Sequence, residues 1–232
     1  MGEKACKKMI TRFHPYHGEN IILMEDNTVA YRKTSFAKAV TFSEKPLLPR
    51  EIFLLEIEKY ESGWSGHMRL GLTLGDPSTT GAHGVPNYAM PDLTNMGRSW
   101  IYAITKTQNH AVQLQCRGMN DLENGGEPER LISGSAHSVR TSRGTIPKSL
   151  LQPTVTNNSQ DILPTDVGSR IGVVYIPVQN DNAEMHFIIN GKDQGACFRD
   201  IPYKKGPLHA VVDVYGTTKQ VRIIQLYGGK WY

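Results

Sequence analysis

Residues 51–77 read EIFLLEIEKYESGWSGHMRLGLTLGDP, and this stretch carries a clear strand pattern. Apolar and acidic side chains alternate from Phe53 to Glu58, and apolar and more polar positions alternate again from His67 to Leu74. Strict alternation with a period of two is typical of β-strands that have one dry face and one wetter face. We therefore predict two strands that are joined by a glycine-containing turn and paired as a hairpin.

The predicted turn, residues 61–66, holds one large aromatic side chain among small polar residues. Trp64 either folds back to cap the core or stands at the rim of a binding surface, and the pattern leaves both alternatives open. Arg69 lies beside the turn on the wetter face of the second strand. Across a hairpin it would pair with Glu56 or Glu58.

Further strand patterns recur along the chain between turn signals. Asn190-Gly191 is a favoured two-residue hairpin turn, because both residues accept positive φ. Residues 208–215 and 219–226 form a last predicted pair, in which Asp213 is expected on the wet face or in an ion pair. Residues 21–24 and 28–32 flank a short turn and are predicted to form a small hairpin. The remaining predicted strands cover residues 39–43, 99–107, 170–177, 183–190 and 192–196. About ten short strands without a long amphipathic helix predict an all-β fold, an antiparallel β-sandwich.

Length and composition narrow the class of protein. The chain has 232 residues, which favours a single domain, and we place that domain at residues 11–227. The net charge of +4 is mild, so the composition does not favour nucleic-acid binding. Cys6, Cys116 and Cys197 are far apart and match no paired spacing, which argues against a disulfide framework and a zinc site. With no bilayer-spanning apolar run and no secretory signal, we expect a cytoplasmic protein.

The first ten residues are predicted to form a flexible, basic N-terminus. A frayed end is one interpretation. The other is attachment to a membrane, because Gly2 would become the first residue after removal of the initiator methionine, and Cys6 stands where the acylation pattern has Ser or Thr. One acyl chain on Gly2 or Cys6, together with the neighbouring lysines, would hold the protein on an anionic membrane.

Residues 109–168 interrupt the strand pattern. They contain few apolar residues and several polar, turn-rich clusters. A long stretch without secondary structure inside a compact domain indicates an insertion that is flexible or carries function. We therefore predict a long polar insertion here.

The sequence motifs of common catalytic sites are missing. There is no phosphate-binding loop, dinucleotide fingerprint, nucleophile elbow or metalloprotease motif. The two glutamates of the first strand share one face, whereas glycoside hydrolysis needs carboxyl groups across a cleft. A nucleophile made of Cys197 and His186 cannot be asserted from their separation in the chain.

His14 and His17 lack further ligands at a suitable spacing, so we expect hydrogen-bonded histidines and no metal. The favoured interpretation is a non-catalytic binding platform.

Five separated blocks, in order, resemble the Neuralized homology repeat, with the insertion excepted. They are RFHPYHGEN (12–20), SFAKAVTFSEKPL (35–47), EIEKYESGWSGHMRLGLT (56–73), PDLTNMGRSW (91–100) and AVVDVYGTTKQVR (210–222). A further block, HFIINGKDQG (186–195), resembles the hairpin of SPRY domains, to which the repeat is related in fold.

The resemblance implies a jelly-roll, SPRY-like β-sandwich that recognises protein substrates within ubiquitin-ligase machinery, without a cofactor. Some family members add a RING, whose two zinc ions need four Cys or His ligands each, and three cysteines cannot supply them. Others end in a SOCS box that binds elongins and a cullin-5 scaffold. The tail at residues 228–232 shows no such box, so contact with elongins or cullin-5 would need a box supplied elsewhere.

The predicted partner-binding residues are Tyr16, His17, Glu61, Trp64 and Arg69. Aromatic residues and arginine in a partly exposed cluster are the usual anchors of a protein interface. The structural alternative for each is packing, loop hydrogen bonding or pairing across the hairpin. A second functional class, suggested by other family members, is a peripheral membrane or phosphoinositide-binding adaptor that uses the basic N-terminus.

Overall fold

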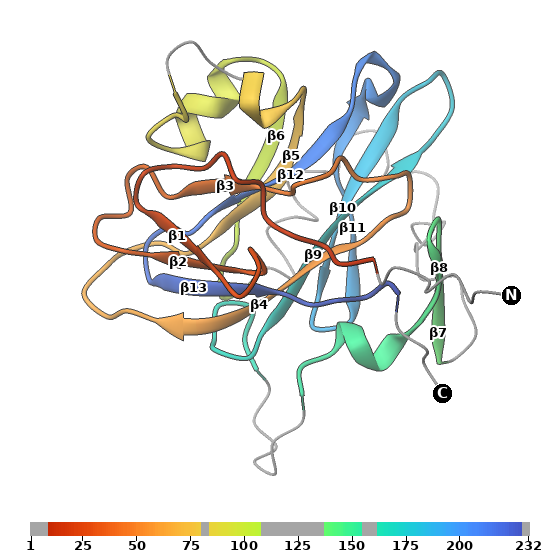
Figure 1. The fold of residues 1–232 in the computed structure, drawn as a ribbon. Helices are drawn as coiled ribbons and strands as arrows, with labels where there is room; N and C mark the ends of the chain where they lie inside the picture. The colour runs from red at the N-terminus through yellow and green to blue at the C-terminus, as the bar shows by residue number, and fades with distance from the viewer. Residues whose placement is uncertain (1–8, 80–83, 108–136, 155–161, 229–232) are drawn as a thin grey trace, which may run out of the picture.

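The protein is a β-sandwich, seen here in a computed structural model that describes residues 9–79, 84–107, 137–154 and 162–228. Two antiparallel sheets pack face to face (Figure 1). This arrangement confirms the antiparallel β-sandwich predicted from the sequence.

The larger sheet has seven strands and the smaller one has four. In spatial order, the larger sheet consists of β1 (Ile21–Met24), β2 (Val29–Arg32), β13 (Thr218–Ile223), β4 (Phe53–Tyr60), β9 (Arg170–Pro177), β10 (Ala183–Ile189) and β11 (Lys192–Ile201). The smaller sheet consists of β3 (Val40–Phe42), β12 (Leu208–Asp213), β5 (Arg69–Leu74) and β6 (Ser99–Ala103). A separate hairpin contains β7 (Ser138–Thr141) and β8 (Gly144–Pro147). Short helical turns cover Pro77–Thr79, Ala89–Leu93, Lys148–Leu151 and Tyr203–Lys205.

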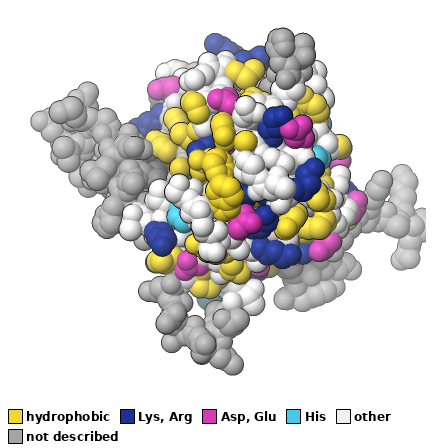
Figure 2. Space-filling view, turned by 90° about the vertical axis from the view of Figure 1, so that its left-hand side faces the viewer, with side chains coloured by type: hydrophobic (Ala, Val, Ile, Leu, Met, Phe, Trp, Pro, Cys, Tyr) yellow, Lys and Arg dark blue, Asp and Glu magenta, His cyan; other side chains and the backbone are white. Residues whose placement is uncertain are grey.

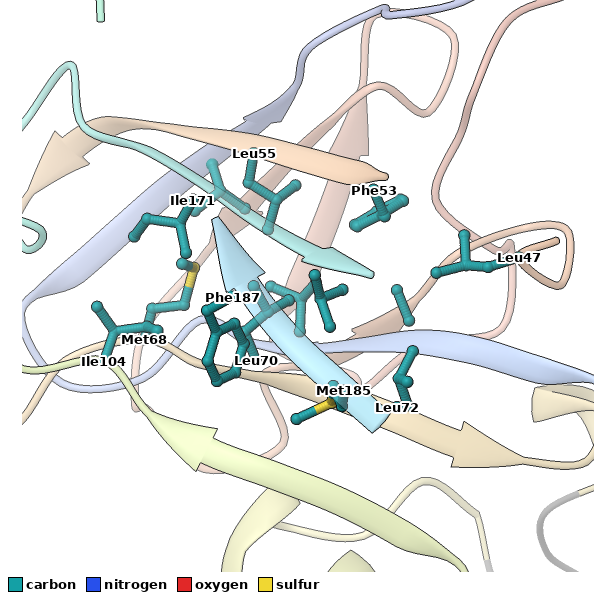
Figure 3. Packing of buried hydrophobic residues seen from close by; sticks show 14 of the residues in the cluster. Leu47, Phe53, Leu55, Met68, Leu70, Leu72, Ile104, Ile171, Met185 and Phe187 are labelled. Atoms are coloured by element: carbon teal, nitrogen blue, oxygen red, sulfur yellow. The ribbon is translucent and has the colours of Figure 1, made fainter. Parts of the chain in front are cut away.

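The main core lies between the two sheets and is built from the dry faces of their strands. Phe53, Leu55 and Ile57 of β4 are buried in it, as the alternation predicted. Leu70 and Leu72 of β5 belong to the same core cluster on the side of the smaller sheet (Figure 3). Fully burying one such side chain contributes about 1.5–3 kcal/mol, so this core is the principal source of stability.

The predicted hairpin between β4 and β5 is wrong. β4 pairs with β13 and β9, and β5 pairs with β12 and β6, so the two strands lie in opposite sheets. Alternation shows which face of a strand is dry but does not show which strand lies beside it. Residues 61–66 cross the roughly 10 Å between the sheets, so that both dry faces meet in one core. The predicted pairing of residues 208–215 with residues 219–226 is also wrong. The corresponding strands, β12 and β13, belong to opposite sheets.

Two of the connections between the sheets, from β4 to β5 and from β12 to β13, pack against each other at one end of the sandwich. We call residues 61–66 the first crossing segment and residues 214–217 the second. The N–H of Glu61 donates to the carbonyl of Thr217 at 2.8 Å, and the N–H of Thr217 donates to the carbonyl of Gly66 at 3.0 Å. Gly216 has a φ of +60°, and a Cβ there would lie 2.2 Å from the carbonyl oxygen of Gly66. The contact between the segments is therefore backbone against backbone and requires glycine at position 216.

Two other predicted hairpins are confirmed. β1 pairs with β2, and β10 pairs with β11. The turn between β10 and β11 has positive φ at both Asn190 (49°) and Gly191 (82°), the conformation that the Asn-Gly signal predicted.

Part of the segment predicted to lack secondary structure is folded. Within residues 137–154, β7 and β8 form a hairpin that leads into a helical turn. Val139, Ile146 and Leu151 are buried against apolar residues on the outer face of β4, β9 and β10. The few apolar residues of this polar stretch were enough to attach it to the sheet, because they fall on one side of a short hairpin.

Several sequence-based expectations fall outside the described residues, including the acylation of Gly2 and Cys6. Cys116 and most of the remaining predicted insertion are also outside them. Within the residues that the structure describes, no helix is long and apolar enough to cross a membrane.

We expect Gly216→Ala to lower the free energy of unfolding by about 3 kcal/mol or more, since it adds a backbone clash to an unfavourable positive φ. Gly63→Ala is the matched control. Gly63 also has positive φ and lies in the first crossing segment, but nothing lies within 4 Å of a Cβ there. It should cost only about 1 kcal/mol. Chemical denaturation of both variants measures the difference, and equal losses would contradict the close packing of the crossing segments.

Candidate functional site

Trp64 stands at the end of the sandwich where the chain crosses between the sheets, and its side chain is 39% exposed. Its indole Nε1–H donates to a carboxylate oxygen of Glu61 at 3.0 Å. Its ring meets the ring of Phe36 edge-on, with the centroids 4.9 Å apart. The structure therefore supports both alternatives in part, because Trp64 is fixed by local packing and still presents surface to solvent.

The rings of Phe36, Tyr88 and Tyr215 lie next to Trp64. We call these four residues the crossing cluster. The centroid of Phe36 lies 4.7 Å from that of Tyr215 and 6.2 Å from that of Tyr88. Tyr88 and Tyr215 meet edge-to-face at 6.2 Å. These separations are those of rings in direct contact. A partner can therefore dock on the outer edges of the cluster, whereas the rings leave little space for a small molecule between them.

Figure 2 looks onto this end of the sandwich. Hydrophobic side chains gather in a stripe near the middle of the face, and Lys, Arg, Asp and Glu side chains lie beside it. Such a combination of apolar and charged surface is suited to contact with another protein.

Arg69 connects the crossing cluster to the smaller sheet. Its guanidinium carbon lies 3.6 Å from the centroid of the Tyr215 ring. Its Nη1 donates to the carbonyl of Met90 at 2.7 Å and to Asp213 at 3.4 Å. The predicted pairing of Arg69 with a glutamate of β4 is wrong, because β4 lies in the other sheet. The expectation of an ion pair for Asp213 is confirmed.

Asp213 is completely buried beneath the cluster. It accepts hydrogen bonds from Arg69 and, at 3.0 Å, from the backbone N–H of Ala89. Burial nevertheless outweighs these interactions and raises the pKa of Asp213 to about 6. The carboxylate thus holds the helical turn Ala89–Leu93 and the arginine in place, at some expense in stability when it is ionised.

Arg32 fixes the other side of the site from the larger sheet. It is fully buried, and its Nη2 donates to Glu61 at 3.0 Å and to the carbonyl of Gly216 at 2.7 Å. Its guanidinium carbon is also 5.7 Å from the centroid of the Trp64 ring. One side chain therefore contacts both crossing segments and the residue that binds the Trp64 indole.

The structure brings together Glu61, Trp64 and Arg69 of the predicted site, through the rings of Phe36 and Tyr215. Tyr16 and His17 lie on another loop and are half-buried. His17 Nδ1 bonds the carbonyl of Gly18 at 2.9 Å, and the N–H of Tyr16 donates to His14 Nδ1 at 2.9 Å. Among the described residues, the ring of Tyr16 does not pair with any ring of the crossing cluster.

Sequence reasoning missed Arg32, Phe36, Tyr88 and Tyr215. For Arg32 a signal existed, since alternation places it on the same face of β2 as the core residue Ala30. An arginine on a dry face requires internal partners. Phe36 and Tyr215 lie in blocks that resemble the repeat, but their meeting depends on the unpredicted crossing between the sheets.

The other candidate sites do not assemble. Glu56 forms an ion pair with Arg170, and Glu58 forms one with Arg222. Both carboxylates are therefore engaged in ion pairs on the outer face of the larger sheet. Met185, Phe187 and Cys197 belong to the main core, which puts the intervening His186 on the opposite face of the sheet from Cys197. The structure therefore excludes the Cys–His nucleophile considered from the sequence.

Comparison with known proteins identifies the family. The family model named Neuralized matches residues 13–225. The chain is 40% identical to neuralized-like protein 2 of mouse and of human, over 94% of this chain and 79% of each relative. The chain belongs to the Neuralized family. The Neuralized fold is confirmed by the crystal structure of the Drosophila melanogaster neuralized-nhr1 domain, which matches with a TM-score of 0.63 and 21% identity, over 93% of this chain and 98% of that one.

The Neuralized family also includes ubiquitin ligases. Human E3 ubiquitin-protein ligase NEURL1B is 37% identical over 94 residues, which is 40% of this chain and 17% of that protein. The similarity to this larger relative thus covers a limited part of its length.

The buried carboxyl group of Asp213 predicts a specific pH dependence. Because its folded-state pKa of about 6 lies above the ordinary value of 3.8, ionisation destabilises the folded state at neutral pH, and this cost disappears as the pH falls toward 3.8. The stability of wild type relative to Asp213→Asn should therefore rise by roughly 2 kcal/mol between about pH 7 and about pH 4. Urea denaturation of both proteins across this range measures it. Parallel pH profiles would show that Asp213 titrates normally.

Proposed function

We propose that this Neuralized domain is a non-catalytic protein-recognition module that selects substrates for ubiquitination in the cytoplasm. The observation that carries the proposal is the crossing cluster, an exposed tryptophan held between an arginine-bound glutamate and a phenylalanine. Family relatives that are E3 ubiquitin-protein ligases support the link to ubiquitination.

A rigid aromatic anchor favours binding to a protein. Tryptophan, tyrosine and arginine dominate the binding energy of protein interfaces, above all where their side chains are already ordered. Trp64 meets this condition, because Glu61 and Phe36 hold its ring in one orientation. Little conformational entropy is then lost when a partner covers it.

Assembly with elongins and a cullin-5 scaffold is a further element of the proposal. It is tested by asking whether these proteins co-purify with the full chain from eukaryotic cells. Their absence would separate substrate recognition, which depends on the crossing cluster, from recruitment of this particular ligase scaffold.

Trp64→Ala should reduce recovery of the bound partners by at least about tenfold, the loss expected for a central anchor. The measurement is quantitative affinity purification of the tagged full chain, followed by mass spectrometry and ubiquitination assays of the recovered proteins. Thermal unfolding of each variant confirms that the fold is intact.

Leu48→Ala is the matched control for this experiment. Leu48 is also an exposed apolar residue, at 42%, but it precedes β4 and so lies toward the other end of that strand. The Leu48→Ala variant should bind all the partners that wild type binds. If the Trp64→Ala variant folds normally and also binds all of them, the crossing cluster is not the recognition site.

A further inference from the structure

A group of lysines on the larger sheet lies directly beside the crossing cluster. Tyr31 is at its centre, on β2, and the ammonium groups of Lys59 and Lys219 lie 5.5 Å and 5.4 Å from the centroid of its ring. Lys33 follows at the end of the same strand and is exposed. We call Tyr31, Lys33, Lys59 and Lys219 the basic patch.

The strand pairing fixes the geometry of the basic patch. Gln220 of β13 lies opposite Tyr31 of β2 on one side and opposite Lys59 of β4 on the other. The residues that carry the patch thus come from three neighbouring strands of a regular sheet. Contact with the face of an aromatic ring also orients an ammonium group. The positive charges are therefore arranged before any partner arrives.

Glu61 joins the basic patch to the crossing cluster. One of its carboxylate oxygens accepts a hydrogen bond from Lys219 at 2.8 Å, and the other accepts from the Trp64 indole at 3.0 Å. The hydrogen bond from Lys219 helps to hold the pKa of Glu61 below its ordinary value. The two surfaces are therefore continuous, with a fixed carboxylate between them.

Positive charge is in excess across this surface. Glu61 is shared between Lys219 and the buried Arg32, so one carboxylate faces two cations. Among the described residues, Lys33 and Lys59 form no ion pair of their own, whereas the nearby Glu58 is paired with Arg222. Lys33 also lies near Glu19, whose pKa is lowered by its hydrogen bond from Lys38 and, to a smaller extent, by the charge of Lys33. An acidic partner would therefore find a net excess of positive charge next to the exposed ring of Trp64.

We propose that the basic patch and the crossing cluster together bind an acidic segment of a partner protein. The segment would place carboxylates beside Lys33 and Lys59 and an apolar side chain on Trp64. This inference rests on the proposed function and names the chemistry of the substrate that it requires.

A protein segment fits this surface better than a membrane does. Interfacial binding needs apolar side chains that enter the lipid layer to a depth of about 5–10 Å. Here Phe36, Tyr88 and Tyr215 are half-buried and packed against one another, which leaves Trp64 as the only exposed ring of the cluster. The patch also has three lysines, fewer than the roughly four to eight basic residues of lipid-binding clusters.

The test is a selection of random peptides displayed on phage against the full chain, followed by affinity measurements with synthetic copies of the enriched peptides. Enriched sequences should combine at least one apolar residue with neighbouring Asp or Glu. The double variant Lys33→Glu/Lys59→Glu should weaken their binding by at least about tenfold. The matched control, Lys45→Glu/Lys192→Glu, reverses two other exposed lysines with the same change in net charge and should bind normally.

The outcomes separate this inference from the proposed function. One outcome is that the peptides lose binding to Trp64→Ala but bind the two lysine double variants equally well. That outcome would support protein recognition by the crossing cluster and would contradict the proposal that the bound segment is acidic. Failure to enrich any peptide, or enrichment of neutral or basic peptides, would overturn it as well. Co-sedimentation with phosphatidylserine-containing phosphatidylcholine vesicles that depends on Lys33 and Lys59, with no acidic peptide bound, would assign the patch to a lipid surface instead.

Discussion

One buried guanidinium, that of Arg32, holds together the end of the sandwich where the two crossing segments meet. It donates to the carbonyls of Thr34, Gly216 and Thr218 and to the carboxylate of Glu61. A buried charge without partners is expensive, whereas one that satisfies several converging acceptors fixes them relative to one another. The strands on either side of the crossing segments share no ladder, so this network replaces the hydrogen bonds that a hairpin would have provided.

The same network shapes the surface that we propose for recognition. Glu61 is held by Arg32 and in turn orients the indole of Trp64. In the smaller sheet, Arg69 has the corresponding place, since it stacks on Tyr215 and reaches the buried Asp213. Each sheet thus contributes one arginine to the rear of the crossing cluster. Rigidity of the aromatic edges follows from this arrangement, and with it a low entropic cost of binding.

Much of the fold, including two hairpins, could be predicted from local sequence, and the pairing of strands that are not joined by a tight turn could not. Alternation identified the buried face of β4, and Asn190-Gly191 identified a hairpin, because both signals act over a few residues. The partners of β4 and β5 lie far away in the chain and leave no local trace. The same limit explains the site. Trp64 and Glu61 were predicted as neighbours, but their contact with Arg32 depends on the long-range arrangement of the sheets.

The most direct test of this account is amide hydrogen exchange of Arg32→Met compared with wild type. The substitution keeps an apolar side chain in place and removes the donors that join the crossing segments. We expect exchange in residues 61–66 and 214–217 to accelerate together by at least about tenfold, while β9 and β10 keep their protection. Unchanged exchange in both crossing segments would contradict the claim that Arg32 holds them, and with them Trp64, in place.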